Sequence, residues 1–330
     1  MTTKEKKWML PFLLILILLI TGCACEKTES PGTPGTTTNE ESPSTPEGEG
    51  ENEENPSPSE DAPVVFSNPF FEEKIKEELG KDTVLQSDLD TITGFAVSAD
   101  EFIFLWGEGR SQKSIIHFYE DEFEYEGVRY KGYGTLTSLE DLKHFKNLKT
   151  LAITLQPDID YATLPEEVLK NLTTLWIYQS KVSDISFLTK AENLGVLRVN
   201  TNNVTDLTPV KDLKNLKRLI VDWNAVEDLT PLTGLTGLIE FSAYGNKIKD
   251  LSPLSGLTNL ETLSLYDNEV ENLEPLTTLT NLKELELISN NIKDVSPLKD
   301  FTSFESLRLN GNPIENIELL SHIEALEFQP

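Results

Sequence analysis

Both cysteines of the 330-residue chain lie in one short stretch, at Cys23 and Cys25. A disulfide between residues so close together has poor geometry, so covalent modification of a thiol is the chemistry this stretch suggests. The run Trp8–Ile20 before it is apolar, and three of the first seven residues are lysine. Because a membrane-spanning helix needs about 20 apolar residues, this shorter run predicts a cleaved export signal over residues 1–22.

The residues Ile20, Thr21, Gly22 and Cys23 resemble the lipobox of bacterial lipoproteins, in which an aliphatic residue and two small residues precede a cysteine. The resemblance implies that the sulfur of Cys23 carries a diacylglyceryl group, which anchors the protein to a membrane from outside the cytoplasm. Cys25 does not fit, because Gly22 would occupy the aliphatic position. Ordinary secretory cleavage near two accidental cysteines is the alternative.

A low-complexity segment follows the cysteines. Residues 26–62 contain eleven acidic residues against one lysine, and they contain no aromatic residue. Such a composition cannot bury a core. We therefore expect residues 23–62 to be a disordered acidic tether rich in Pro, Ser, Thr and Glu, either a stalk that raises a folded domain or a tolerated spacer.

The net charge of the chain, −28, excludes nucleic acid as a partner. Residues 1–22 hold three lysines against one glutamate, which leaves −30 on the remainder, and the tether accounts for −10 of that. Residues 63–330 therefore carry −20, which repels nucleic acid and anionic lipid headgroups at long range.

No motif in the sequence predicts an active site. The chain has no His-Glu-x-x-His, no Gly-x-Ser-x-Gly and no phosphate-binding Gly-rich loop. Its three histidines, His117, His144 and His322, are scattered. We therefore expect no enzyme activity, no cofactor and no metal site.

The remainder of the chain is dominated by a period of 22 residues. Seven gapless units run from Leu172 to Ala325, each with the pattern L-x-x-L-x-L-x-x-N or a close variant. A longer unit begins at Leu148, and the segment from Gly134 matches the back half of a unit. Self-similarity at this period is typical of the leucine-rich repeat, in which each coil buries its apolar face only by stacking on its neighbours.

The spacing within a unit predicts the fold class, an α/β leucine-rich repeat right-handed solenoid. The alternating leucines, such as Leu263 and Leu265, point inward from a short strand on the concave side. The segment Asp250–Leu254, with its proline, suits a 3₁₀ return on the convex side. A ladder of buried asparagines is expected to hydrogen-bond the backbone of neighbouring turns. Its members are Asn202, Asn224, Asn246, Asn268, Asn290 and Asn312.

The 22-residue repeat with its Asp-Leu-Ser/Thr-Pro-Leu segment resembles the internalin type of bacterial surface protein. The segment from Asn68 resembles the helical N-terminal cap of that family, with Phe71, Ile75 and Leu79 on one helical face. Gly80 is expected to end this helix. A second helix is expected to open at Ser87 with apolar positions at Leu89 and Ile92. The resemblance implies a cap over residues 63–133 and repeats over residues 134–330.

Two segments depart from the internalin pattern. Residues 95–133 alternate in a way that predicts strands with turns at Gly107 and Gly127. They either cover the edge of the first coil or form a lobe that contacts a ligand. The sequence also ends one strand after the last full unit, with no obvious C-terminal cap.

Positions three, five and seven of each unit point to the concave face, and position eight flanks them. These positions supply a candidate ligand-binding set of aromatic, aliphatic and arginine side chains, the types that dominate interface hot spots. The set is Trp176, Tyr178, Arg198, Ile220, Trp223, Tyr244 and Tyr266. Toward the C-terminus the face turns acidic through Glu240, Glu261, Asp267, Glu284 and Glu286, which suits a partner with a basic edge.

Together these features predict a lipid-anchored, surface-exposed binding protein whose concave face holds a protein ligand, as internalin-like adhesins do. A polysaccharide that stacks on the same aromatics is the runner-up. Structural assembly of the envelope through the uncapped C-terminal edge is a third possibility. The aromatics also have a purely structural interpretation, as neighbouring-strand pairs that stabilise the sheet.

Overall fold

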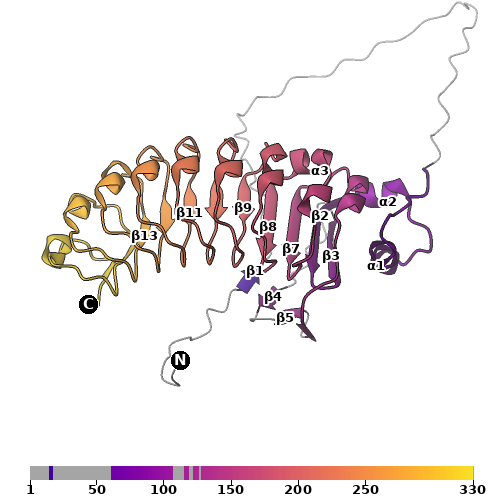
Figure 1. Cartoon of the computed structure of the whole chain (residues 1–330), viewed down its shortest axis with the longest axis horizontal. Coiled ribbons are helices and arrows are strands. Elements are labelled where there is room, and N and C mark those ends of the chain that lie inside the picture. Colours follow the sequence, from indigo (N-terminus) through magenta and orange to yellow (C-terminus); the bar gives the residue numbers. More distant parts are fainter. Residues whose placement is uncertain (1–14, 18–60, 107–114, 119–121, 126–127, 330) are drawn as a thin grey trace, which may run out of the picture.

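The computed structural model describes residues 15–17, 61–106, 115–118, 122–125 and 128–329, most of which form a curved solenoid (Figure 1). The leucine-rich repeat fold expected from the 22-residue period is confirmed. Cys23, Gly107, Gly127 and nearly all of the expected tether lie outside the described residues. The domain boundaries at residues 22, 62 and 133 therefore stay predictions.

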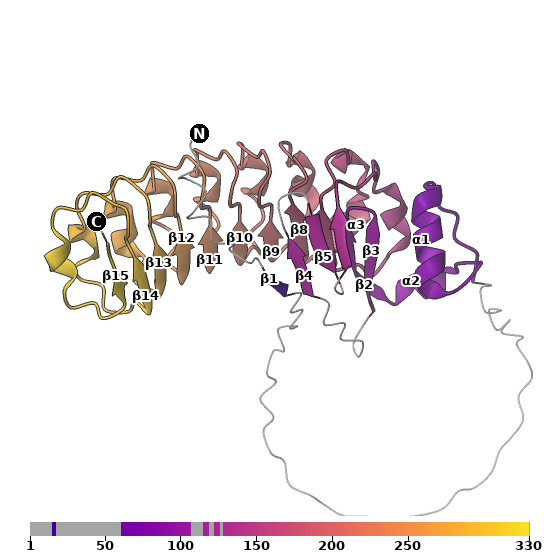
Figure 2. The same cartoon turned by 90° about the horizontal axis from the view of Figure 1, so that it is seen from below.

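One sheet of eleven strands runs the length of the solenoid (Figures 1 and 2). Its neighbours are parallel throughout except for the terminal pair β2 and β3, which is antiparallel. From one end to the other the strands are β3 (Glu101–Trp106), β2 (Ile92–Ser98), β7 (Thr150–Thr154), β8 (Thr174–Tyr178), β9 (Val196–Arg198), β10 (Arg218–Ile220), β11 (Glu240–Ser242), β12 (Thr262–Ser264), β13 (Glu284–Glu286), β14 (Ser306–Arg308) and β15 (Leu326–Glu327).

The repeat period fixes the register of this sheet. Leu219 pairs with Phe241, which pairs in turn with Leu263, each step being one 22-residue unit. All three side chains are fully buried, as is Leu265 on the following inward position. Because every coil repeats these positions, the leucines form one continuous core from the N-terminal helices to the last coil.

Short 3₁₀ helices return the chain on the convex side, as the Asp-Leu-x-Pro-Leu segments predict. An aspartate or asparagine caps most of these turns, as where Asp250 accepts a 2.8 Å hydrogen bond from the Ser252 N–H. The first long unit differs, because it returns through the α-helix α3 (Glu166–Asn171). The 3₁₀ helices are Glu140–His144, Tyr161–Thr163, Ser186–Lys190, Thr208–Val210, Thr230–Leu232, Ser252–Leu254, Glu274–Thr278, Ser296–Leu298 and Ile317–Leu320.

Asparagines at position nine join each coil to the one before it. The Oδ1 of Asn246 accepts from the Val226 N–H at 2.9 Å, and its Nδ2 donates to the Val221 and Ala243 carbonyls at 3.0 Å each. Asn202, Asn224, Asn268, Asn290 and Asn312 make equivalent bonds. The amides thus satisfy backbone groups that the turn leaves unpaired inside the protein.

The ladder continues into two coils where the residue is not asparagine. Ser180 occupies position nine of its unit, and its hydroxyl accepts from the Gln156 N–H at 3.2 Å. Gln156 occupies the same position one coil earlier, where its Oε1 accepts from the Leu136 N–H at 3.2 Å. Both residues are buried. Aligning the units at position nine would have found them, although the asparagine pattern alone did not.

A second asparagine ladder runs along the last position of the units. In each case the side-chain Nδ2 donates to a backbone carbonyl of the preceding coil, 23 or 25 residues earlier in the sequence. Asn193 bonds the Lys170 carbonyl at 2.8 Å, and Asn259 bonds the Thr236 carbonyl at 2.8 Å. The other members are Asn171, Asn215 and Asn281. Gly237 interrupts this ladder.

Two helices cover the N-terminal end of the core. α1 (Pro69–Leu79) begins at Asn68, whose Oδ1 accepts from the Phe70 N–H at 3.0 Å, and ends at Gly80 in the left-handed conformation. Phe71 of this helix is fully buried against Phe95 and Phe102. The helix therefore shields apolar side chains that the first coil would otherwise expose.

The second helix is shorter than the sequence predicted. α2 (Gln86–Asp90) buries Leu89, but the expectation that it includes Ile92 is wrong, because Ile92 begins β2. The segment that follows is rich in Phe, Val and Ile, which favour strands. β2 pairs in parallel with β7, and β3 turns back against β2 around Ala99. The hairpin thus extends the sheet to a point before the predicted start of the repeats.

A separate four-stranded antiparallel sheet consists of β1 (Ile15–Ile17), β4 (Ile115–Phe118), β5 (Glu122–Tyr125) and β6 (Val128–Lys131). β1 comes from the expected export signal and pairs with β4. Both views place β4 and β5 beside the N-terminal end of the long sheet (Figures 1 and 2).

Gly237→Asn should stabilise the protein by roughly 0.5–1.5 kcal/mol, because the new amide can donate to the Lys214 carbonyl and complete the second ladder. A Cβ at Gly237 would lie 3.5 Å from that carbonyl oxygen, and the closer contact, at 3.0 Å, is the end of the flexible Lys217 side chain. Urea unfolding measures the gain. Gly237→Ala is the control, because it removes glycine without adding the bond. An equal gain in both variants would contradict the hydrogen-bond explanation.

Candidate functional site

The concave face presents the side chains of positions three, five and seven between parallel strands. Tyr178, Tyr244 and Tyr266 at position seven are half-buried, as are Trp176 and Arg198 at position five. Trp223 is 45% exposed. The expectation that Ile220 is available on this face is wrong, because it is only 6% exposed beneath its neighbours.

Three aromatic rings lie in contact across three coils. The Trp223 and Tyr244 ring centroids are 5.4 Å apart in an edge-to-face arrangement, and those of Tyr244 and Tyr266 are 6.1 Å apart. Such contacts contribute about 0.5–1.5 kcal/mol beyond area burial. The rings therefore form a pre-ordered aromatic surface, which we call the aromatic cluster (Trp223, Tyr244 and Tyr266).

The backbone at position eight aims Trp223 at this face. Trp223 has φ +51°, and Gly245 at the same position of the next coil has φ +67°. Every unit from the first long one onward adopts a left-handed conformation here; the other residues are Leu155, Gln179, Thr201, Asp267, Ser289 and Gly311. The Trp223 ring lies over Gly245, where an added Cβ would overlap it. Glycine at position 245 therefore makes room for the indole.

A second pair lies further toward the N-terminus. Trp176 and Arg198 are opposite one another in the pairing of β8 and β9, and the guanidinium carbon lies 5.1 Å from the indole centroid. Burial lowers the pKa of Arg198. The guanidinium thus stacks on an aromatic face in a partly desolvated position, which strengthens a cation–π contact.

Asp222 lies buried between the Trp176–Arg198 pair and the aromatic cluster. Its Oδ1 accepts from the Ser242 hydroxyl at 2.5 Å and from the Tyr244 N–H at 3.2 Å, and its Oδ2 accepts from the Asn200 Nδ2 at 3.0 Å. It is 4% exposed, and this burial raises its pKa to about 7. Burial therefore outweighs the three hydrogen-bond donors, which by themselves would lower the pKa.

The acidic end of the face is largely neutralised by cations on adjacent coils. Glu240 pairs with Arg218 at 3.2 Å, Glu261 with Lys283 at 2.6 Å and Glu286 with Arg308 at 3.7 Å. Each pair is partly exposed and contributes at most about 1 kcal/mol. The expectation that this end calls for a basic partner is therefore weakened, since only Asp267 and Glu284 of the five acids make no ion pair among the described residues.

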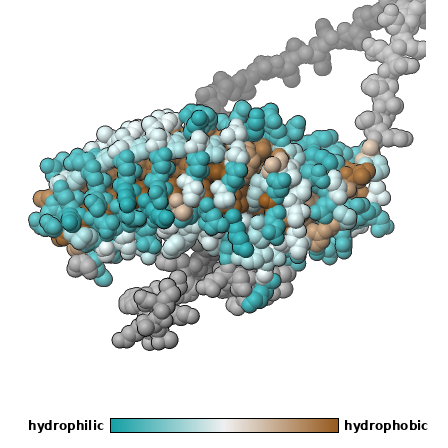
Figure 3. Space-filling model, in the orientation of Figure 1, coloured by the Kyte–Doolittle hydropathy of each residue, from teal (hydrophilic) through white to brown (hydrophobic). Residues whose placement is uncertain are grey.

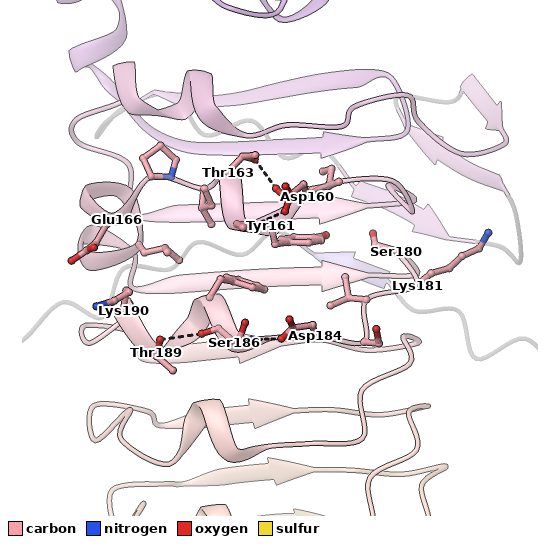
Figure 4. A pocket seen from close by; sticks show the side chains of 18 of the residues that line it. Asp160, Tyr161, Thr163, Glu166, Ser180, Lys181, Asp184, Ser186, Thr189 and Lys190 are labelled. Atoms are coloured by element: carbon pink, nitrogen blue, oxygen red, sulfur yellow. Dashed lines mark hydrogen bonds between the residues drawn. The ribbon is translucent and has the colours of Figure 1, made fainter.

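A groove of about 720 Å³ opens elsewhere, between the first long coil and the coil after it (Figure 4). Tyr161 and Phe187 stack within it with ring centroids 5.0 Å apart. Its carboxylates Asp160 and Asp184 are already used to cap local turns. The extra length of the first unit could have signalled this groove in the sequence. Because these two carboxylates serve the turns and Glu166 is paired with Lys170, the concave face is the stronger candidate.

Figure 3 shows hydrophilic residues in columns along the C-terminal coils, with apolar residues between them and toward the N-terminal cap. Among the described residues, no group of His, Cys, Asp and Glu is arranged to hold a metal ion. In the same part of the chain, no helix has the length and apolarity to cross a membrane.

Comparison with known proteins agrees with the leucine-rich repeat fold. The family model "Leucine Rich repeats (2 copies)" matches residues 236–278 and 280–322. An internalin (inlF) from Listeria monocytogenes superposes with a TM-score of 0.56 at 25% identity, over 81% of this chain and 86% of that one. The chain has a leucine-rich repeat fold similar to that of this internalin. An internalin C2 from the same species gives a TM-score of 0.49 at 23% identity, over 80% and 95% of the two chains. The sequence matches no curated protein.

Leucine-rich repeat domains typically mediate protein–protein interactions through an extended concave surface. In this protein the aromatic cluster and the Trp176–Arg198 pair occupy that surface. The fold is therefore that of a binding protein, and the residues on the face decide what it binds.

Gly245→Ala should displace Trp223 from Tyr244, because the added methyl overlaps the indole ring. Near-UV circular dichroism should lose the signal of the ordered aromatic pair. Gly311→Ala is the matched control, since Gly311 also occupies position eight with φ +72° but its Cβ would meet only Ser289, at 3.3 Å. Both variants carry a left-handed alanine, at a cost of about 1–2 kcal/mol. Equal spectra for the two variants would contradict the packing role of Gly245.

Asp222→Asn should change how stability depends on pH. The folded pKa of Asp222, about 7, lies above the usual aspartate value of 3.8, so between these two values the unfolded chain releases a proton that the folded chain keeps. This contribution to stability is present at low pH and is lost as the pH rises toward 7. From pH 5 to pH 8, the stability difference should shift in favour of the variant by roughly 2–3 kcal/mol.

Urea unfolding of both proteins at each pH measures this shift. The control is Asp250→Asn, because hydrogen bonds from Ser252 lower the pKa of Asp250, so that it titrates below this window in both states. Its difference from the wild type should stay constant between pH 5 and 8. A constant difference for Asp222→Asn as well would contradict the buried-carboxyl interpretation.

Proposed function

We propose that this protein is a lipid-anchored bacterial surface protein that binds a protein partner on its concave face. The observation that carries the proposal is the aromatic cluster, half-exposed and pre-ordered at the centre of the long sheet. Rigid aromatic side chains in a desolvated setting are typical interface anchors. The core does not require them, because the leucines on the opposite side of each strand already fill it.

The anchor part of the proposal rests on the sequence. Cys23 completes the pattern Ile20-Thr21-Gly22-Cys23, and the acidic, proline-rich segment after it would span roughly 33 Å as a flexible chain. A diacylglyceryl group on Cys23 would hold this segment at the membrane surface, with two acyl chains giving durable attachment. The repeat domain would then stand clear of the bilayer and reach a partner on another surface.

Replacing Trp223, Tyr244 and Tyr266 together by alanine should weaken partner binding by at least about 30-fold, the equivalent of one 2 kcal/mol hot spot. Full-length protein is used to capture partners from cell-surface extracts, which are identified by mass, and the captured partner is then titrated against both forms. Tyr133→Ala is the control, because Tyr133 is an exposed aromatic (41%) outside the cluster. Undiminished affinity of the triple variant would remove the concave face from the proposal, and binding to a glycan array alone would favour a polysaccharide ligand.

Cys23→Ala should release the protein from the membrane fraction of the producing cells, because the sulfur that carries the lipid is lost. Cys25→Ala should leave the protein in that fraction. Immunoblots of fractionated cells, with the mass of the intact N-terminal peptide, measure both outcomes. If Cys23→Ala stays bound to membranes, lipidation at this residue is wrong.

A further inference from the structure

Buried polar atoms without hydrogen-bond partners gather in one part of the concave face. Six such side-chain atoms occur among the described residues, and four of them belong to two adjacent coils. They are the Trp176 Nε1, the Gln179 Oε1, the Arg198 Nε and the Asn200 Oδ1. Buried polar groups are nearly always bonded, so a concentration of unbonded ones requires an explanation.

Arg198 also lacks a carboxylate partner, which sets it apart from the other arginines of this face. Arg218 pairs with Glu240, and Arg308, at the same position five of a later coil, pairs with Glu286 and Glu327. No ion pair to Arg198 occurs among the described residues.

Two acids, Glu240 and Asp222, act on the charge of Arg198, and both already have other partners. Glu240 is held by Arg218 at 3.2 Å. One oxygen of Asp222 accepts from Ser242 and Tyr244, and the other accepts from Asn200. The raised pKa of this carboxyl also reduces its negative charge near neutral pH. Neither acid forms an ion pair with Arg198, so they offset its charge only from a distance.

The surroundings of Arg198 are those of a built anion receptor. Its neighbours in the strand register are Trp176 on one side and the buried Ile220 on the other. Apolar flanks reduce the local dielectric and strengthen an ion pair that forms there. Contact with the Trp176 ring also restricts the motion of the guanidinium, which favours two-point binding of a carboxylate.

We propose that Arg198 and Trp176 form the receptor for a carboxylate of the protein partner, the side chain of an Asp or Glu. One carboxylate oxygen accepts from the guanidinium of Arg198, and the other accepts from the Trp176 Nε1–H. The Asn200 Oδ1 and the Gln179 Oε1 accept from backbone N–H groups beside the acidic residue. Asn200 is 8% exposed, so its free oxygen is held in place rather than solvated.

Charge favours a carboxylate over a phosphate or sulfate. Residues 63–330 carry a net charge of −20, and Asp222 and Glu240 both lie close enough to act on the charge of Arg198. A dianion would meet more repulsion than a single guanidinium offsets. A monoanion matches the single charge of the Arg198 guanidinium, which makes no ion pair among the described residues. The inference deepens the proposed function, because it names the chemistry of the partner group that enters the N-terminal half of the face.

The test uses acetate as the probe and needs no identified partner. In the full-length ¹⁵N-labelled protein at constant ionic strength, replacing chloride with acetate should shift the Trp176 indole and Arg198 Nε–H resonances saturably, with a dissociation constant in the millimolar range. Arg198→Gln should abolish the shift of the Trp176 resonance. Arg308→Gln, the same substitution at an ion-paired position five, should leave it unchanged.

Arg198→Lys, which keeps the charge but loses the planar fork, should weaken acetate binding several-fold and serves if the glutamine variant fails to fold. A linear, unsaturating response to acetate, or an equal shift in the Arg198→Gln protein, would overturn the proposal. Tighter binding of sulfate than of acetate would overturn the assignment to a carboxylate. If acetate does not bind, the result of partner capture with the variant of the aromatic cluster is unaffected. The two proposals can therefore fail independently.

Discussion

The stacking of identical coils depends on one interaction, the side-chain amide at position nine that bonds the backbone of its own turn and of the coil before it. A 22-residue coil contains only three residues of regular strand in most units, so its remaining inward backbone groups need partners from elsewhere. Asn246 and its equivalents supply both a donor and an acceptor in a single buried group. Without such groups the leucine core would enclose unpaired N–H and C=O groups, each costing about 1–3 kcal/mol.

The same constraint shapes the binding face. Because the asparagine must turn inward at position nine, the chain bends sharply just before it, and position eight takes the left-handed conformation in every unit. Residues five and seven then point to the concave side in fixed rows one strand apart. A ligand therefore meets a surface whose spacing is set by the core, and only the identity of the side chains varies from coil to coil.

The repeat, its register and the inward leucines were predictable because they follow from a pattern that seven gapless units repeat. Ser180 and Gln156 were missed because the position nine hydrogen bond tolerates other polar residues at the N-terminal end. The exposure of Ile220 and the pairing of Glu240 with Arg218 depend on which neighbours cover or reach a side chain, and sequence periodicity does not contain that information. Ile92 was assigned to a helix because the strand that it begins, β2, pairs in parallel with β7, more than fifty residues away in the sequence.

The two halves of the concave face differ in how the polar side chains at position five are bonded. At position five the C-terminal coils carry Ser264, Glu286 and Arg308, which bond across coils to one another or to a neighbouring acid. In the coils of β8 and β9, Trp176 and Arg198 occupy this position and leave buried polar atoms unbonded. Nothing in the repeat prevents such bonding between adjacent coils from being used along the whole face. Among the described residues, two adjacent coils hold four of the six unbonded buried polar atoms, while the C-terminal coils bond nearly all of theirs. Such a local departure from the rules of the repeat is expected where binding rather than stability selects the residue.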